Sequence, residues 1–149
     1  MSVPLVVSPD KAPAPLKMVG EEITVLASAE QTGSYEIFRQ SGSEGSGPPP
    51  HSHAWDEAFY VCEGQVVFGI DAEQDLIAGP GTLVHVPGGS THWFRFGPNG
   101  GVMLSITSGA GASAFFTQVD REVSPTNPDL GLLVGVAMAH GLNIPIPAA

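Results

Sequence analysis

The sequence predicts an all-β protein of many short strands, with an extended arm at the N-terminus and one short helix near the C-terminus. Three observations predict this class. Glycine (19) and proline (14) are abundant among the 149 residues, which favours turns over long helices. Segments rich in β-branched and aromatic residues recur at short intervals from Ile23 onward. A helical pattern begins only near the C-terminal end. The length suits one domain.

The first element is an arm over residues 1–20. It contains four prolines, which make an extended segment and exclude a helix: Pro4, Pro9, Pro13 and Pro15. The apolar residues 4–7 (PLVV) leave two alternatives open. They add a strand to a sheet edge, for example that of a partner subunit, or they belong to a partly disordered tail.

Residues 21–120 are expected to form the β-domain. Strands are predicted at 23–28, 34–40, 57–70, 82–87, 91–96, 102–107 and 113–119. The longest of these segments is interpreted as two strands joined tightly at Glu63-Gly64. Short strands with regular turn residues between them indicate a sandwich or a barrel.

Residues 121–149 are expected to form a helix and a tail. Asn127 is the predicted N-cap, Pro128 takes the first helical position, and Gly141 ends the helix. One apolar face would pack on the β-domain: Leu130, Leu133, Val134, Ala137 and Met138.

Composition excludes several classes of partner. The net charge is −10 and only five residues are Lys or Arg, so we expect no binding to nucleic acid or to an anionic membrane. The single cysteine, Cys62, excludes an internal disulfide and is expected to be a small buried residue. The N-terminus does not resemble a signal peptide, and the apolar runs are too short to span a membrane. A cytoplasmic protein is therefore expected.

Histidines and a carboxylate cluster in two segments. His51 and His53 share one face of a strand, and Glu57 has the same parity. His92 follows a turn at residues 87–89 and can reach the same point from a different strand. Imidazole and carboxylate suit a borderline divalent metal, which makes His51, His53, Glu57 and His92 candidate ligands.

These spacings resemble the two motifs of the cupin superfamily. The first motif is matched by Gly45, His51, His53, Glu57 and Gly64, and the second by Gly81, Pro87, Gly89 and His92. The second motif ends in Asn in the family, where this chain has Phe96. The resemblance covers about residues 20–118 and implies a small jelly-roll-type β-barrel that holds one divalent metal, with Fe, Mn, Ni, Co, Cu and Zn left open.

Within the superfamily the chain resembles single-domain cupins related to quercetin dioxygenases. That resemblance implies a metal-dependent dioxygenase acting on a phenolic or enolic small molecule, with Glu57 also serving as general base. Two alternatives stay open: a non-oxidative cyclase or isomerase of polyketide-type metabolism, and a non-catalytic small-molecule-binding cupin. The family resemblance and the N-terminal arm together lead us to expect a homodimer.

Three aromatic residues are predicted to line a substrate pocket beside the metal. Phe59 shares the parity of Glu57, and Phe94 and Phe96 share the parity of His92. Ordinary barrel core is the alternative for them. His85 is either a hydrogen-bonding partner near the site or an outward-facing residue, and Arg39 is the one cation considered for substrate binding.

Overall fold

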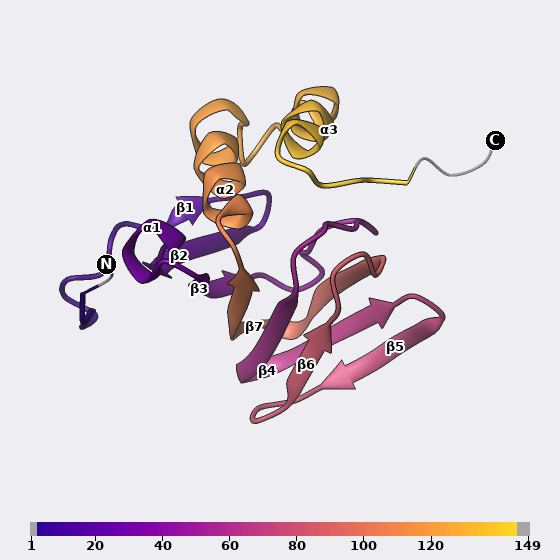
Figure 1. Cartoon of the computed structure of the whole chain (residues 1–149). Coiled ribbons are helices and arrows are strands. Elements are labelled where there is room, and N and C mark those ends of the chain that lie inside the picture. Colours follow the sequence, from indigo (N-terminus) through magenta and orange to yellow (C-terminus); the bar gives the residue numbers. More distant parts are fainter. Residues whose placement is uncertain (1–2, 146–149) are drawn as a thin grey trace.

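Two long bent strands form the centre of the protein, as seen in a computed structural model that describes residues 3–145 (Figure 1). These are β4 (Glu57–Ile70) and β7 (His92–Ser108), which pair antiparallel along most of their length. The first half of β4 also pairs with β6 (Leu83–Val86), and its second half pairs with β5 (Glu73–Ala78). The all-β, jelly-roll class is therefore confirmed.

The remaining strands extend the sheet beyond β7. They are β1 (Leu16–Lys17), β2 (Glu21–Ala27) and β3 (Tyr35–Gly42), in the order β1-β2-β3-β7-β4-β5. The short helix α1 (Ala29–Thr32) connects β2 to β3. Its N-cap Ser28 and Gln31 form a reciprocal capping box, which explains why a helix starts here.

The predicted strand break at Glu63-Gly64 is wrong, because β4 continues through it. The register shifts on both sides of this pair, and Gly64 adopts a φ of 73°. Glycine tolerates this left-handed conformation, so the backbone forms a bulge and bends instead of reversing. In the same way the predicted strands 91–96 and 102–107 are one strand, β7.

The predicted strand at 113–119 is also wrong, since these residues lie in helix α2 (Gly111–Glu122). The spacing of the apolar side chains gives the reason. Residues 112, 115, 116 and 119 recur at helical intervals and pack into one cluster with Phe38 of β3. The rings of Phe116 and Phe38 pack edge to face, with their centroids 5.2 Å apart.

The predicted C-terminal helix is present as α3 (Leu130–Ala139). Its N-cap is Asp129 instead of Asn127, and the Asp129 carboxylate accepts a hydrogen bond from the Leu132 amide at 3.0 Å. Gly141 follows the helix with a φ of 83°, as expected of a helix stop. Both α2 and α3 lie on the same side of the sheet (Figure 1).

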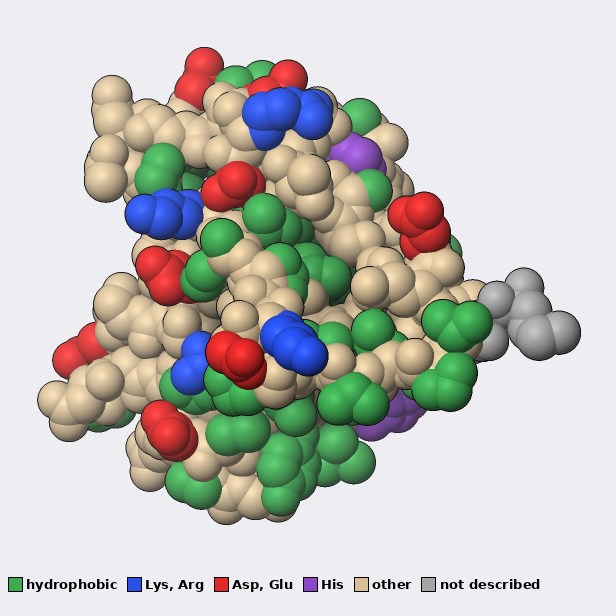
Figure 2. Space-filling model, turned by 90° about the vertical axis from the view of Figure 1, so that its left-hand side faces the viewer, with side chains coloured by type: hydrophobic (Ala, Val, Ile, Leu, Met, Phe, Trp, Pro, Cys, Tyr) green, Lys and Arg blue, Asp and Glu red, His purple; other side chains and the backbone are tan. Residues whose placement is uncertain are grey.

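Three smaller differences concern the surface. Residues 4–7 do not form a strand. In the part of the arm that the structure describes, only β1 pairs with the sheet. Cys62 is exposed rather than buried, because it points outward from β4. Strand β5 was not predicted, since its exposed residues 73–77 give no apolar alternation. Figure 2 shows acidic side chains scattered over one face, with a few separate Lys and Arg side chains among them.

The apolar core has two parts. The first lies between the strands, where Phe59 and Phe96 are fully buried. The second lies between β2, β3 and the two helices. Glu36 of β3 fixes this second part, because its buried carboxylate accepts hydrogen bonds from the Ala29 amide at 3.0 Å and from the Ser113 amide and hydroxyl at 2.9 and 2.5 Å. Helix α2, which has no side-chain cap of its own, is thereby anchored to the barrel.

Candidate metal centre

The segment that carries His51 and His53 is held by backbone hydrogen bonds on both sides. His51 and His92 exchange two such bonds, at 3.0 and 2.8 Å. Ser52, between the two histidines, exchanges two more with Asn143 of the C-terminal segment, at 2.9 and 2.8 Å. The fold therefore fixes the backbone of the two histidine-bearing segments next to each other.

Each of the three imidazoles is oriented by one backbone carbonyl two residues away. The Nδ1 atoms lie 2.9 Å from their partners: Pro49 for His51, Trp55 for His53 and Ser90 for His92. A carbonyl oxygen only accepts hydrogen bonds, so each Nδ1 carries the proton and each Nε2 is left for another partner.

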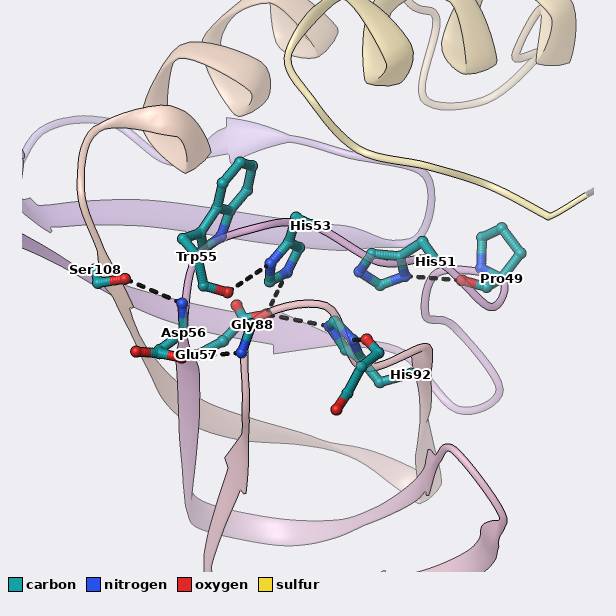
Figure 3. Close-up of polar contacts among 10 residues, drawn as sticks. Pro49, His51, His53, Trp55, Asp56, Glu57, Gly88, His92 and Ser108 are labelled. Carbon is teal, nitrogen blue, oxygen red and sulfur yellow. Dashed lines mark hydrogen bonds and ion pairs between the residues drawn. The ribbon is translucent and has the colours of Figure 1, made fainter.

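The free nitrogens converge on one point (Figure 3). One ligand atom from each of His51, His53 and His92 lies within 4.8 Å of the other two. Glu57 Oε1 lies 3.1 Å from His53 Nε2 and 3.3 Å from His92 Nε2. All four side chains are buried. The structure thus brings together the four residues that were predicted as ligands from two separate segments.

The protonation of this cluster suits a cation. Burial acts to raise the pKa of Glu57, but the close contacts of its Oε1 with His53 and His92, at 3.1 and 3.3 Å, outweigh it and lower that pKa to about 2. Burial lowers the pKa of His51 to about 4, and the neighbouring His92 adds to this effect. At neutral pH the cluster therefore offers a carboxylate and a neutral His51 imidazole, which are the forms that bind metal.

The turn between His53 and Glu57 is tied to the second motif. The Asp56 carboxylate accepts a hydrogen bond from the Gly88 amide at 2.9 Å, and the Asp56 amide donates to Ser108 Oγ at 3.0 Å. Gly88 has no room for a side chain, because an added Cβ would lie 2.3 Å from a backbone oxygen of Ala54. These contacts hold the turn next to the metal cluster and require a glycine at residue 88.

A cavity of about 400 Å³ opens beside the cluster, between the barrel and the two helices. His51, His53 and Glu57 line it, together with mainly apolar side chains from β2, α2, α3 and the C-terminal segment. Of the three aromatic residues predicted for the pocket, Phe94 lines this cavity, whereas Phe59 and Phe96 lie in the strand core. Arg39 and His85 are exposed and do not contribute to the lining.

Sequence reasoning missed three polar residues of the cavity. Trp55 stacks on His53, with ring centroids 4.3 Å apart and planes 6° from parallel. Glu21 and Gln40 line the cavity from β2 and β3. The alternation in 21–27 places Glu21 on the same face as the buried Ile23, which is the signal that would have found it.

The donor set fits a divalent transition metal. Three imidazoles and one carboxylate are the ligand types that Fe, Mn, Co, Ni, Cu and Zn share, and together with such an ion they carry a net charge of about +1. The carbonyls bound to Nδ1 are the outer partners that metal-ligating histidines usually have.

Comparison with known proteins agrees with this geometry. A family model described as "Cupin domain" matches residues 40–106, which contain all four cluster residues. The chain belongs to the cupin superfamily. The match of this cupin to a curated protein is local: it is 37% identical over 51 residues to an acireductone dioxygenase of Parasynechococcus marenigrum, covering 32% of this chain and 27% of that protein. The matched part is therefore about a quarter of the relative's length.

Solved structures share the fold at low sequence identity. An RmlC-like cupin from Shewanella frigidimarina superposes with a TM-score of 0.63 at 19% identity, over 74% of this cupin and 96% of that chain. The polyketide cyclase RemF from Streptomyces resistomycificus superposes with a TM-score of 0.62 at 20% identity, over 71% and 80% of the two chains. Within residues 3–145, every helix is too short or too polar to cross a membrane.

Proposed function

We propose that this cupin is a metal-dependent enzyme that acts on a phenolic or enolic small molecule. The first candidate is a dioxygenase, which uses dioxygen as its second substrate. The observation that supports it most directly is the convergence of one imidazole nitrogen from each of three histidines and the Glu57 carboxylate beside an apolar cavity. His51, His53, His92 and Glu57 would hold the ion. When bound, such an ion supplies Lewis acidity and a site at which an oxygen group and dioxygen can react.

The residues of the chain have separate roles in this proposal. The backbone carbonyls of Pro49, Trp55 and Ser90 keep the three rings in one tautomer. Glu57 is ionised, and its carboxylate is the group that can accept the proton of a substrate hydroxyl. The apolar side chains of the cavity exclude water and favour an uncharged or mono-anionic substrate.

We favour oxidative chemistry because the curated protein with a local match to this chain is an acireductone dioxygenase. The second candidate is non-oxidative cyclisation or isomerisation. The apolar cavity suits the substrates of this chemistry equally well, and one protein of similar fold is a polyketide cyclase. Both need the same four residues, so they differ only in whether oxygen is consumed.

An oxygen-electrode assay tests the proposal. Protein loaded with Fe(II), Mn(II), Co(II), Ni(II), Cu(II) or Zn(II) is mixed with flavonols and 1,3-dicarbonyl compounds, and oxygen uptake and product are followed together. Uptake with product supports a dioxygenase, and product without uptake supports the non-oxidative candidate. Binding without product across the panel would indicate a ligand-binding cupin and contradict the enzymatic proposal.

We also propose that the protein is cytoplasmic and forms a homodimer. Light scattering of the full chain and of a variant that begins at Leu16 tests the part of the arm in association. A monomer in both cases would contradict it.

A further inference from the structure

Two polar side chains of the cavity do not belong to the metal cluster. Apart from that cluster and Trp55, Glu21 and Gln40 are the only lining side chains with polar atoms among residues 3–145. They come from β2 and β3, which carry none of the four cluster residues. The rest of the lining is apolar side chain, glycine or proline, so these two residues need an explanation.

The strand register places the two side chains together. Gln40 lies opposite Ile23, and Glu21 lies opposite Gly42, so Glu21 and Gln40 are diagonal neighbours on the inner face. Gln40 Nε2 lies 3.4 Å from Glu21 Oε1. Gln40 is 3% exposed, and its Oε1 is buried without a hydrogen-bond partner within the described residues. An apolar pair would avoid the cost of that unpaired oxygen.

The charge state of the pair matches an uncharged ligand group. Burial raises the pKa of Glu21 to about 8, against the opposing effect of Arg95 and with a further increase from Glu57. The carboxyl group is therefore mainly protonated at pH 7 and can donate a hydrogen bond as well as accept one. No Lys or Arg of the described chain lines the cavity, so a phosphate or a second carboxylate would find no counter-charge there.

We propose that Glu21 and Gln40 form a second hydrogen-bonding subsite, which receives a hydroxyl or carbonyl group of an uncharged, largely apolar substrate whose enol oxygen faces the metal cluster. The inference rests on the proposed function, because the cluster must bind the other end of the same molecule. It narrows the substrate class to molecules with two oxygen functions, one at each end, and excludes sugar phosphates and dicarboxylates.

Binding of two enols to the Co(II)-loaded protein without oxygen tests the subsite. The probes are 3-hydroxyflavone, which has only the hydroxyl–carbonyl end, and quercetin, which has the same end and further hydroxyls on both rings. We expect the wild type to bind quercetin about tenfold more tightly, as one or two added hydrogen bonds predict. In the variant with both Glu21→Leu and Gln40→Leu, we expect the two affinities to agree within about twofold.

Matched variants separate binding from structure. Glu22→Leu changes the exposed neighbour of Glu21 and should keep the preference for quercetin, and Glu21→Gln should keep most of it because an amide also donates and accepts. The melting temperature of the double variant should not fall, since it loses an unpaired buried group. A fall in melting temperature with equal loss of both affinities would show a purely structural pair and overturn the inference.

The cobalt content of each sample distinguishes the two levels of failure. Protein that takes up no cobalt contradicts the proposed function itself. Protein that takes up cobalt but binds neither enol overturns the substrate class and the subsite with it. Protein that binds both enols equally well, or a double variant that keeps the tenfold preference, overturns the subsite alone.

Discussion

The two walls of the cavity are built in different ways. The barrel wall carries His51, His53 and Glu57, and His92 completes the metal cluster from outside the cavity lining. Each of the three imidazoles is oriented by a backbone carbonyl, and Glu57 Oε1 lies within hydrogen-bond distance of His53 and His92. The helical wall, α2 and α3, is almost entirely apolar, and side chains such as Leu130 remain 65% exposed. In the proposed function, the barrel wall therefore supplies the metal ligands and the polar contacts, and the helical wall supplies apolar contacts to the substrate.

The largest effect should come from breaking the metal cluster beside the barrel wall. His92→Ala removes the only cluster residue that the second motif supplies, so we expect metal affinity to fall at least about 100-fold. The helices should not change, because His92 is not part of the cavity lining. Metal content after dialysis and near-ultraviolet circular dichroism measure the two effects. His85→Ala is the matched control, since His85 is exposed on β6, and a loss of metal there would contradict the assignment.

Detaching the helical wall should have the next largest effect. Glu36→Ala removes the acceptor of three hydrogen bonds that join α2 and residue 29 to β3, and we expect a loss of about 2–4 kcal/mol in the free energy of unfolding. Urea unfolding measures it, with Glu44→Ala in an exposed loop as control. If both variants unfold alike, Glu36 does not anchor the helix.

This contrast also explains which parts of the molecule the sequence predicts. The ligand cluster depends on short-range spacing: the parity of His51, His53 and Glu57, and a glycine-rich turn before His92. Such patterns are visible in a single sequence. Helix α2 depends on packing against Phe38 and on Glu36, which lies 77 residues before Ser113. A seven-residue window around Phe115 and Phe116 has the composition of a strand, so it was predicted as one.

The residues that line the cavity also depend on long-range packing, which a single sequence does not reveal. Phe59 and Phe96 have the parity predicted for the pocket, yet they lie in the strand core because parity fixes a face but not a height along the barrel. Glu21 lies just before the predicted strand 23–28 and Gln40 ends the predicted strand 34–40, and neither residue was predicted to line the pocket. Their place in the cavity follows from the pairing of β2 with β3 and from the position of the helices. The spacing of residues along the sequence predicts neither of these.

Two glycine substitutions compare a packed position of the helices with an open one. Gly111 of α2 faces Trp55 of the barrel wall, whereas Gly135 of α3 faces open space. An added Cβ at Gly111 would lie 2.7 Å from Trp55 Cζ3, and Trp55 stacks on His53. We expect Gly111→Ala to destabilise the protein by about 1–3 kcal/mol and to weaken metal binding slightly. Gly135 of α3 has no atom within 4 Å of an added Cβ, so Gly135→Ala should stabilise it by about 0.5–1 kcal/mol. Thermal melting measures both, and two shifts of the same sign would contradict this packing.

The smallest effect is expected in the pH dependence of stability. On the acid side, the pKa of His51 is lowered from 6.5 to about 4 and that of Glu57 from 4.5 to about 2. The unfolded chain binds these protons first, so both groups destabilise the fold as the pH drops from about 6.5 to 2. Glu21 acts in the opposite direction, because burial raises its pKa from 4.5 to about 8. Its contribution is complete below pH 4.5 and is lost as the pH rises through about 8.

Glu21→Gln isolates this last contribution, since glutamine keeps the shape of the protonated carboxyl group but does not ionise. We expect the free energy of unfolding of the wild type to fall between pH 5 and 9 as Glu21 ionises, because the folded protein holds this proton to a higher pH than the unfolded chain does. The variant should lose correspondingly less, while its acid limb stays unchanged because His51 and Glu57 are untouched. Urea unfolding across this pH range measures both limbs. Parallel curves above pH 5 would mean that Glu21 is already ionised in the folded protein, and the second subsite would then present a carboxylate to its ligand.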